Sequence, residues 1–462
     1  MARAKKEAAL TPEERLQAAL VPDWEWPYKL PKNWCWTNWG ECGEFVAGSG
    51  FKNEYQGFTN YDIPFYKVSS LKTANETGYL CDNTNTVDET VRKKLKAALI
   101  PANSLLFAKI GEAIRLNRRA INTVPCCVDN NMMAFIPIIC QLKYAFYWSK
   151  GIDLYDFTNA TTVPAIRKTD LEKISFPLAP LAEQQRIVDR IESLFTKLDE
   201  AKEKAQAVVD SFETRKAAIL HKAFTGELTA KWREEHDVGM ESWKTRELAE
   251  CFEIVSGIQK TPARSPKDNP VPYLTVANVY RGRIDLSDIR YFEVTSKEIE
   301  KLKLQDKDIL IVEGNGSGNE IGRCAIWHNE LPLCIHQNHI IRMRRKTADI
   351  LPEYALHYLN SEAGKSIMRE RSKTTAGLFN LSAGKIKTIP LPMASLDEQS
   401  EIIHLIDSLL EKEQWAKESA EAALDQIDLM KKSILARAFR GELGTNDPSE
   451  ESAVELLKRT IL

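Results

Sequence analysis

The sequence contains no run of about 18 uncharged apolar residues, the length that a membrane-spanning helix needs. Its first residues, MARAKKEAALTPEERLQ, are basic, but no apolar stretch follows them, so we expect no secretory signal. The nine cysteines are an odd number and include no CxxC pair, which predicts free thiols in a reducing compartment. We therefore expect a cytoplasmic protein with no membrane segment.

The chain also lacks a strong net charge, because 63 Lys and Arg stand against 65 Asp and Glu in 462 residues. A hydrophobic fraction of 43% excludes wholesale disorder, and the length suggests about three domains. Residues 1–176 carry 22 basic and 19 acidic residues, and residues 231–391 carry 25 and 22, so each segment has a net charge of +3. Two mildly basic segments are compatible with nucleic-acid contact, but imbalances of this size are also ordinary.

The strongest feature is an internal duplication with an offset of 215 residues. Residues 177–228 align with residues 392–443 without a gap, and nearly half of the 52 positions are identical. The copies close on the similar phrases AFTGEL and AFRGEL. A weaker match of Trp34 to Gly48 with Trp243 to Gly257 extends the repeat upstream. This order predicts two tandem copies of one module, which can pack with pseudo-twofold symmetry.

Each strongly repeated segment predicts one long helix. No Pro or Gly occurs from Glu183 to about Phe224 or from Glu398 to about Phe439, and Gly226 and Gly441 are the expected C-terminal breakers. Apolar residues recur at steps of four and three, a heptad seam typical of coiled coils, which Glu413 interrupts in the second copy. The predicted seam residues are Ile187, Ile191, Leu194, Leu198, Ala205, Phe212, Ile402, Ile406, Leu409, Ala416, Ala420 and Ile427. Packed antiparallel, two helices of about 40 residues would form a rod of roughly 60 Å; two core helices of a globular protein are the alternative.

The segments between the helices predict mixed α/β domains. Short β-rich runs alternate with Gly, Asn and Pro, which favours twisted sheets with long loops. Arg, Lys, Asn and Gln beside such strands can bind base edges, and Lys, Arg and Ser can hold phosphates, although each could equally be a solvated loop residue. The candidate DNA-binding residues are Lys67, Ser69, Ser70, Lys72, Lys109, Arg115, Asn117, Arg118, Arg119, Gln259, Lys260, Arg264, Asn278, Tyr280, Arg281, Arg283, Arg323, Gln337, Asn338 and Lys373.

No catalytic or metal-binding set emerges from the sequence. The glycine-rich loop from Gly314 to Gly322 precedes a strand-like run, whereas a dinucleotide site requires a helix there. The spacing of Cys334, His336 and His339 matches no zinc-ligand pattern, and we expect His336 to be a polar residue beside a strand that could face DNA. We therefore predict a non-catalytic binding protein with no metal site.

The helix starts PLAPLAEQQRIVDRIE and PMASLDEQSEIIHLID, with the endings KAFTGELTAKW and RAFRGEL, resemble the specificity (S) subunits of type I restriction-modification enzymes. The two-fold layout extends this resemblance over nearly the whole chain. The resemblance implies two target recognition domains, each reading one half of a bipartite, asymmetric site in double-stranded DNA. It also implies that the helices set the spacing of the half-sites and dock two methyltransferase (M) subunits. No cofactor is expected in this subunit; S-adenosylmethionine, ATP and Mg are expected on M and restriction/translocase (R) subunits.

The predicted fold class is α+β, with two tandem pseudo-symmetric mixed α/β domains separated by two long antiparallel coiled-coil helices. The predicted segments are an N-terminal extension (1–30), target recognition domain 1 (31–176), helix 1 (177–230), target recognition domain 2 (231–391), helix 2 (392–443) and an acidic C-terminal tail (444–462). The tail ends in a candidate amphipathic helix, Ala453 to Leu462, available to bind a partner. A stand-alone DNA-binding regulator and a coiled-coil interaction scaffold are the alternative functions.

Overall fold

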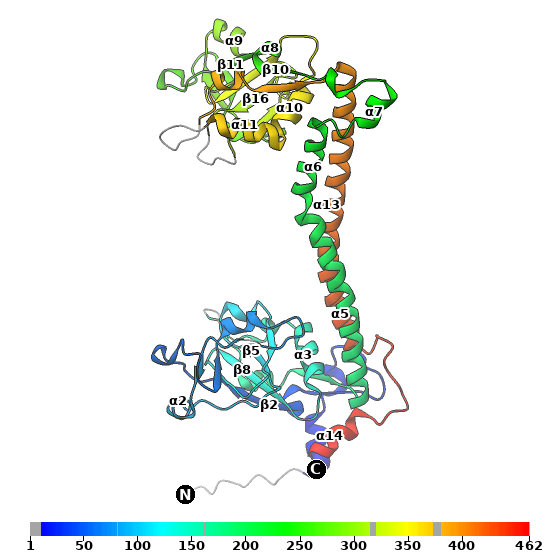
Figure 1. Cartoon of the computed structure of the whole chain (residues 1–462). Helices are drawn as coiled ribbons and strands as arrows, with labels where there is room; N and C mark the ends of the chain where they lie inside the picture. The colour runs from blue at the N-terminus through cyan, green and yellow to red at the C-terminus, as the bar shows by residue number, and fades with distance from the viewer. Residues whose placement is uncertain (1–10, 81, 160–162, 315–319, 373–379, 462) are drawn as a thin grey trace. The chain divides into compact units, whose positions relative to one another are not determined.

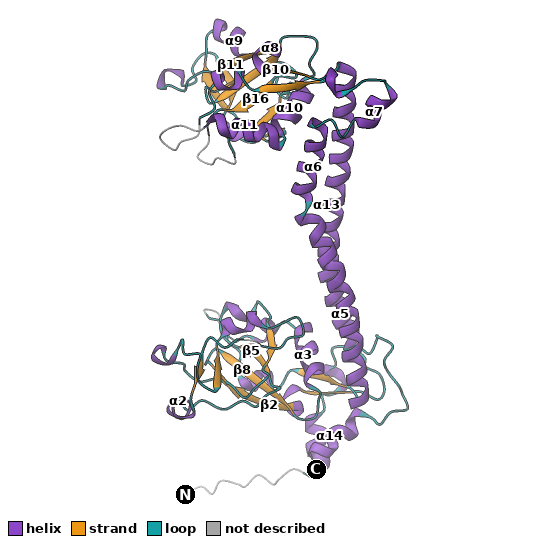
Figure 2. Cartoon of the chain, viewed as in Figure 1, coloured by secondary structure: helices purple, strands orange, loops and turns teal. Residues whose placement is uncertain are grey.

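The structure is a computed structural model that describes residues 11–80, 82–159, 163–314, 320–372 and 380–461. The chain forms two compact units, and the pairing of strands and helices within each can be followed in Figures 1 and 2. Unit 1 comprises the residues up to Lys204 together with those from Ala423 onward, and unit 2 comprises Ala205–Ala422. Each unit combines mixed β-sheets with helices, which agrees with the predicted α+β class.

The strands of unit 1 are β1 (Cys35–Asn38), β2 (Gly43–Ala47), β3 (Ile63–Tyr66), β4 (Thr86–Val87), β5 (Leu105–Ala108), β6 (Arg119–Ile121), β7 (Cys127–Val128), β8 (Met132–Pro137) and β9 (Ser175–Leu178). An antiparallel sheet in the order β2-β8-β5-β6 forms the centre of the unit. Beside it lie the sheet β4-β3-β7, in which β3 and β7 run parallel, and the pair β1-β9. The buried Trp39 packs against Phe45, Phe107, Phe135 and Trp148 in the core under the central sheet.

The strands of unit 2 are β10 (Lys244–Glu247), β11 (Phe252–Ser256), β12 (Pro270–Leu274), β13 (Val279–Tyr280), β14 (Arg283–Ile284), β15 (Arg290–Glu293), β16 (Ile309–Val312), β17 (Cys324–Ile326), β18 (Ile335–His336), β19 (Ile340–Arg345) and β20 (Pro390–Met393). Their sheets β11-β19-β16-β17, β15-β12-β18 and β10-β20 repeat those of unit 1, including a parallel pair, β12 with β18. The predicted duplication is therefore a duplication of topology. The hairpin β13-β14 has no counterpart among the described residues of unit 1.

The helices fall into three groups. Unit 1 contains α1 (Pro12–Ala19), α2 (Glu89–Lys94), α3 (Leu142–Gly151), α4 (Lys168–Leu171) and α14 (Ala453–Ile461). Unit 2 contains α6 (Phe212–Phe224), α7 (Ala230–Glu235), α8 (Leu248–Cys251), α9 (Ser296–Leu302), α10 (Pro352–Asn360), α11 (Glu362–Ser372) and α12 (Ala383–Lys387). The long helices α5 (Leu181–Asp210) and α13 (Leu396–Ala438) contribute residues to both units.

The first long helix is broken where the sequence predicts an uninterrupted one. The break falls at Ser211, whose hydroxyl donates to the carbonyl oxygen of Ala207 at 2.5 Å and accepts from Arg215. A serine hydroxyl that bonds the preceding turn competes with regular helix hydrogen bonding. The C-terminal breakers are confirmed, because Gly226 and Gly441 follow the helices with φ of 82° and 74°.

The long helices run antiparallel within each unit. In unit 1, α5 and α13 are joined by ion pairs of Lys431 with Asp199 and of Lys202 with Asp428. In unit 2, Arg215 on α6 pairs with Glu413 on α13 at 2.5 Å. This ion pair explains why the charged Glu413 occupies an apolar position of the predicted second seam.

The predicted seam residues are unequally buried. The buried ones are Ile187, Ile191, Phe212, Ile402, Ile406, Ala420 and Ile427, and the half-buried ones are Leu194, Leu198, Ala205, Leu409 and Ala416. Of these, Ile187 and Ile191 belong to the core of unit 1, and Ile402 and Ile406 belong to that of unit 2. The helices are therefore anchored in the sheet domains at their N-terminal ends, while continuous heptad packing along them stays a prediction.

The two ends of the described chain lie together in unit 1. Helix α14 packs beside α1, which shows near the C label in Figure 1. Its residues Ala453 and Leu457 are buried in the same core as Ala19, and the amide of Ala453 donates to the carbonyl oxygen of Asn33 at 2.9 Å. The predicted tail helix is thus confirmed, but its apolar side is occupied within this chain, which corrects its proposed use for a partner.

Candidate DNA interface

In each unit, a glycine after the edge strand of the central sheet approaches another loop too closely to carry a side chain. A Cβ atom at Gly48, after β2, would lie 1.9 Å from the carbonyl oxygen of Asp129. A Cβ atom at Gly257, after β11, would lie 2.2 Å from the carbonyl oxygen of His336. The same two loops therefore meet in both units, and several candidate residues lie around these meeting points.

Four candidate residues surround the meeting point in unit 2. The side chains of Gln259 and Lys260 are exposed beyond the close-approach glycine, and those of Gln337 and Asn338 are half-buried on the opposite loop. The backbone amide of Asn338 donates to the carbonyl oxygen of Ile258 at 2.8 Å, and this hydrogen bond joins the two loops. This arrangement brings four polar side chains from two distant parts of the sequence to one region.

The imidazole of His336 does not reach that surface. It is fully buried, and its Nδ1 lies 2.9 Å from the carbonyl oxygen of Ile340. Burial lowers the pKa of His336 to about 4, because a charged ring would lose its hydration there. The prediction that this residue could face DNA is therefore wrong: it is a neutral core histidine.

In unit 1, four candidates lie on or just before the short 3-10 turn Val68–Thr73. The ammonium of Lys67 donates to Oε1 of Gln56 at 2.8 Å, and the amide of Lys67 donates to the hydroxyl of Ser70 at 3.1 Å. Ser70 is buried and caps the turn, so its observed role is structural, whereas Ser69 and Lys72 are exposed. The half-buried Lys109 follows β5, and burial lowers its pKa.

The basic cluster before β6 separates into exposed and buried members. Arg115 and Arg118 are exposed, and the guanidinium of Arg115 lies 3.5 Å from the ring centre of Tyr155. Asn117 has a φ of 47° and donates to the carbonyl oxygen of Ile152 at 2.9 Å. The guanidinium of Arg119 is buried and donates to Oδ1 of Asn117 at 2.6 Å, and burial lowers its pKa to about 9. Arg119 is thus a core residue that stabilises this turn through Asn117, which corrects its selection as a DNA-binding candidate.

The remaining candidates of unit 2 gather mainly at the hairpin β13-β14. Tyr280 and Arg283 are exposed, and Arg281 and Arg323 are half-buried beside them. Asn278 is buried beneath the hairpin, where its amide donates to two backbone carbonyl oxygens, so it is a structural residue rather than a surface one.

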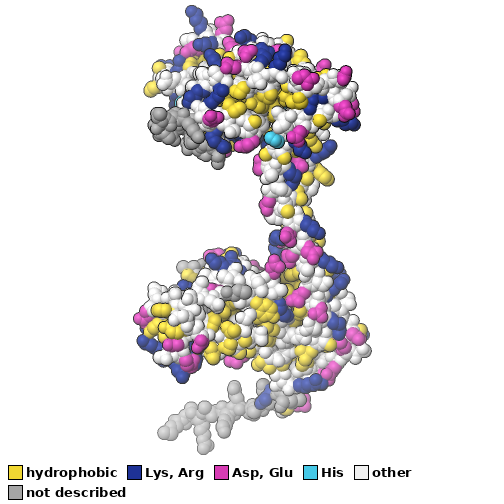
Figure 3. All heavy atoms as spheres, in the orientation of Figure 1, with side chains coloured by type: hydrophobic (Ala, Val, Ile, Leu, Met, Phe, Trp, Pro, Cys, Tyr) yellow, Lys and Arg dark blue, Asp and Glu magenta, His cyan; other side chains and the backbone are white. Residues whose placement is uncertain are grey.

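Two further candidates lie elsewhere. Arg264 is half-buried and pairs with Glu298 at 2.8 Å, and Lys373 lies outside the described residues. Basic and acidic side chains are interspersed over the visible surface of each unit rather than collected in one patch (Figure 3). DNA contact by the exposed and half-buried candidates stays a prediction, and the structure removes only the buried ones.

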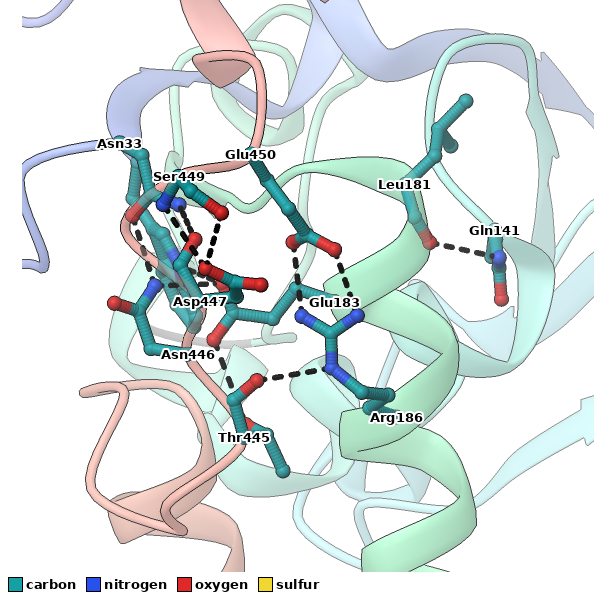
Figure 4. A network of polar contacts seen from close by, with 11 residues as sticks. Asn33, Gln141, Leu181, Glu183, Arg186, Thr445, Asn446, Asp447, Ser449 and Glu450 are labelled. Carbon is teal, nitrogen blue, oxygen red and sulfur yellow. Dashed lines mark hydrogen bonds and ion pairs between the residues drawn. The ribbon is translucent and has the colours of Figure 1, made fainter.

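Sequence reasoning missed a buried carboxylate near the start of each long helix. In unit 1, the side chain of Glu183 is fully buried. Its carboxylate accepts from Nε1 of Trp34 at 2.7 Å and from the side-chain amide of Asn446 at 2.8 Å. Next to it, Arg186 pairs with Glu450 at 2.7 Å, and Figure 4 shows these tail residues folded over the start of α5. The C-terminal tail is therefore part of the structure of unit 1.

The equivalent carboxylate of unit 2, that of Glu398 on α13, is also fully buried. It accepts from Nε1 of Trp243 at 2.8 Å, from the hydroxyl of Thr229 at 2.8 Å and from the guanidinium of Arg233 at 2.6 Å. The signal for both sites was present in the repeat, since each long helix carries the pair Glu-Gln in its first turn and each domain has an aligned tryptophan near its start.

Two classes of feature are not observed in the described part of the chain. No group of three or more His, Cys, Asp or Glu side chains there is placed to hold a metal ion. Among the same residues, no helix is both long enough and apolar enough to cross a bilayer.

The duplicated domains define a recognised class. The model of the type I restriction modification DNA specificity domain matches residues 31–209 and 240–421, and the chain belongs to this family. The chain is 30% identical over 282 residues to the EcoKI specificity subunit of Escherichia coli K12, an alignment that covers 60% of each chain. It is 25% identical over 302 residues to the StySPI specificity subunit of Salmonella potsdam, covering 65% of this chain and 64% of that protein. The aligned regions thus span less than two thirds of these relatives.

The fold agrees with a solved structure of the same class. The HsdS subunit from Thermoanaerobacter tengcongensis matches with a TM-score of 0.61 and 18% identity, covering 90% of this chain and 99% of that one. This likeness extends over both units and the long helices, so the tandem arrangement of the two sheet domains is the fold of this class.

Proposed function

We propose that this chain is the DNA sequence-specificity subunit of a type I restriction-modification complex. Each unit would read one half of a bipartite, asymmetric DNA site. The observation that carries this proposal is the repetition of one sheet topology, with the same close loop approach, under different surface residues. The hairpin β13-β14 occurs in unit 2 without a described counterpart in unit 1, and unlike surfaces on equal scaffolds favour an asymmetric target.

In this proposal the chain itself is not a catalyst. Two M subunits would bind S-adenosylmethionine and methylate adenine, and R subunits would use ATP and Mg for translocation and cleavage, in the cytoplasm. The long helices offer apolar surface for M subunits, because Trp415 in unit 2 and Leu429 and Met430 in unit 1 are exposed. A hollow between α5 and α13 in unit 1, of about 340 Å³, is lined by residues that include Leu194, Leu198 and Ile434.

A map of methylated adenines in host DNA, with and without this gene, tests the proposal. We expect a bipartite motif that disappears on deletion and returns when the full-length gene is restored. A gene with residues 31–176 taken from another family member should change one half of the motif and leave the other half unchanged. An identical methylation map in the presence and absence of the gene would contradict the proposal and favour the regulator or scaffold function.

A further inference from the structure

The hairpin β13-β14 presents a short polar ribbon. Its strands pair Val279 with Ile284 and Tyr280 with Arg283, and Arg281 and Gly282 form a two-residue turn. Gly282 has a φ of 75°, which suits such a turn, and a Cβ atom built on it would meet nothing within 4 Å. None of the described residues therefore crowds that side of the turn.

The base of the hairpin is fixed by buried hydrogen bonds. The side-chain amide of Asn278 donates to the carbonyl oxygens of Asp285 and Asp288 at 2.9 and 3.0 Å. The amide of Gly282 donates to the carbonyl oxygen of Cys324 at 2.9 Å, which fastens the turn to strand β17. A ribbon held at both ends keeps its side chains in place, so a ligand that binds them meets a prepared surface.

An aromatic ring close to two guanidinium groups marks this ribbon. The guanidinium carbon of Arg283 lies 4.3 Å from the ring centre of Tyr280, and that of Arg323 lies 5.6 Å from it. The side chain of Arg323 is only 14% exposed and donates to the carbonyl oxygen of Val276, so it is held in place beside the ring. The side chain of Arg283 is 63% exposed, with its Nη1 3.6 Å from Oδ2 of Asp285.

The contacts of Arg283 leave part of its donor fork free for a ligand. The ring of Tyr280 lies against the guanidinium, Asp285 approaches Nη1, and the exposed remainder of the planar fork faces solvent. A planar fork of this kind matches the O6 and N7 acceptors of guanine, and a two-stranded ribbon is narrow enough for the major groove. A phosphate contact needs only a positive charge, which the exposed Lys260 beside the close-approach loop can supply without such support.

We propose that Arg283 reads a guanine in the half-site assigned to unit 2 and that Tyr280 is the positioning residue that orients it. This inference rests on the proposed function. It divides the basic residues of the hairpin into a reader, Arg283, and a support, Arg323.

Selection from a pool of duplexes with a randomised central stretch tests the inference. The full-length chain is recovered from its host with the subunits it carries, and the bound duplexes are sequenced. We compare wild type with Arg283→Ala, Arg283→Lys and the matched control Arg290→Ala. The side chain of Arg290 is 54% exposed on β15, the next strand along the chain. Arg283→Ala should lose one guanine preference in one half of the motif and bind the wild-type motif about 5- to 150-fold more weakly. The control should keep the full motif.

The other variants and outcomes separate the explanations. Arg283→Lys should fail to restore the guanine preference, because an ammonium lacks the planar fork, and Tyr280→Ala should weaken the same preference without affecting the other half-site. An unchanged motif with uniformly weaker, less salt-dependent binding would overturn the inference in favour of a phosphate contact. If Arg290→Ala lost the same preference, the assignment to Arg283 would also be wrong. A wild-type chain that selects no motif would instead contradict the proposed function.

Discussion

The same buried carboxylate is stabilised differently in the two units. Glu398 in unit 2 is bound by the cationic Arg233 on α7, in the segment that leads directly from α6 into the second domain. Glu183 in unit 1 is bound by neutral donors, among them Asn446 from the C-terminal tail. Duplication preserved the carboxylate, its tryptophan partner and a donating segment directly after the repeated Gly-Glu-Leu, while the donor residues of that segment differ between the units.

This difference teaches that the two units depend on different parts of the chain. Unit 2 closes its carboxylate site with the charged Arg233, 165 positions before Glu398, whereas unit 1 closes it with uncharged tail residues more than 250 positions after Glu183. We therefore expect equivalent substitutions in the two units to have unequal effects, and the following variants measure that inequality.

The largest effect is expected for Arg233→Met, which leaves the carboxylate of Glu398 buried without its cation. Removing one partner of a buried ion pair lowers the free energy of unfolding by about 3–5 kcal/mol. Unit 2 should therefore unfold at a much lower denaturant concentration. Hydrogen exchange followed by mass spectrometry reports each unit separately. Lys231→Met, on the same helix but 87% exposed, should have no effect, and Arg233→Met with Glu398→Gln should recover most of the loss. An equal loss of protection in unit 1 would contradict the assignment of this site to unit 2 alone.

Leu457→Ala should produce the next largest effect, in the opposite unit. This leucine is fully buried between the tail and the N-terminal segment, and a truncation of this kind costs about 2–4 kcal/mol. Unit 1 should lose that stability while unit 2 keeps its own, measured by the same exchange experiment. Leu429→Ala is the matched control, since its side chain is 56% exposed on α13. An unaffected unit 1 would mean that the tail is dispensable for it.

Acidification should separate the units through two titratable groups, His336 in unit 2 and Asp129 in unit 1. The pKa of His336 is about 4 in the folded chain against an ordinary 6.5, so the unfolded chain binds the extra proton as pH falls through this range. Unit 2 should therefore lose about 2 kcal/mol between pH 7 and pH 5. Burial raises the pKa of Asp129, so in unit 1 the folded state binds its proton first and acid is stabilising at this position.

Denaturant unfolding at several pH values, followed for each unit, checks this prediction. His336→Gln should flatten the acid-dependent loss in unit 2, even if it lowers the stability at pH 7. The exposed control His328→Gln should leave the pH dependence as it is in the wild type. A wild-type unit 2 that is equally stable at pH 7 and pH 5 would refute the assignment.

The smallest effect is expected when the helix pair of unit 2 is given the residues of unit 1. The 215-residue offset aligns Arg215 and Glu413 with Met430 and Leu198. Arg215→Met combined with Glu413→Leu should change stability by about 1 kcal/mol or less, because apolar replacement of a partly buried ion pair is often neutral. Arg215→Met alone should be more destabilising than the double change, as judged by thermal unfolding. A double variant as destabilised as Arg215→Met alone would contradict this expectation.

Much of this architecture could be predicted from short-range patterns. Helix ends followed from glycines such as Gly226 and Gly441, and the duplication predicted two similar domains before any strand was assigned. The break at Ser211 could not be predicted, because it depends on a hydroxyl and on Arg215 reaching back along the helix. No Pro or Gly marks that position.

The candidate interface was harder to predict, because residue type does not reveal burial. Arg119 and Asn278 have the chemistry of DNA-binding residues, yet both satisfy backbone or side-chain partners inside their domains. Exposure of Arg283, by contrast, depends on a tight turn that only the three-dimensional structure reveals. The carboxylate sites required contacts between residues 149 to 263 positions apart in the sequence, and one sequence read alone does not report such contacts.

The pairing of the two chain ends has a consequence for protein synthesis. Translation proceeds from the N-terminus, and domains made first usually fold first. The residues of unit 2 are complete once Ala422 has been added, but unit 1 still needs α14 and the donors of the tail, which are added later. The domain that is begun first is therefore finished after the second, and a released chain truncated before Leu443 would carry a complete second domain and an open first one.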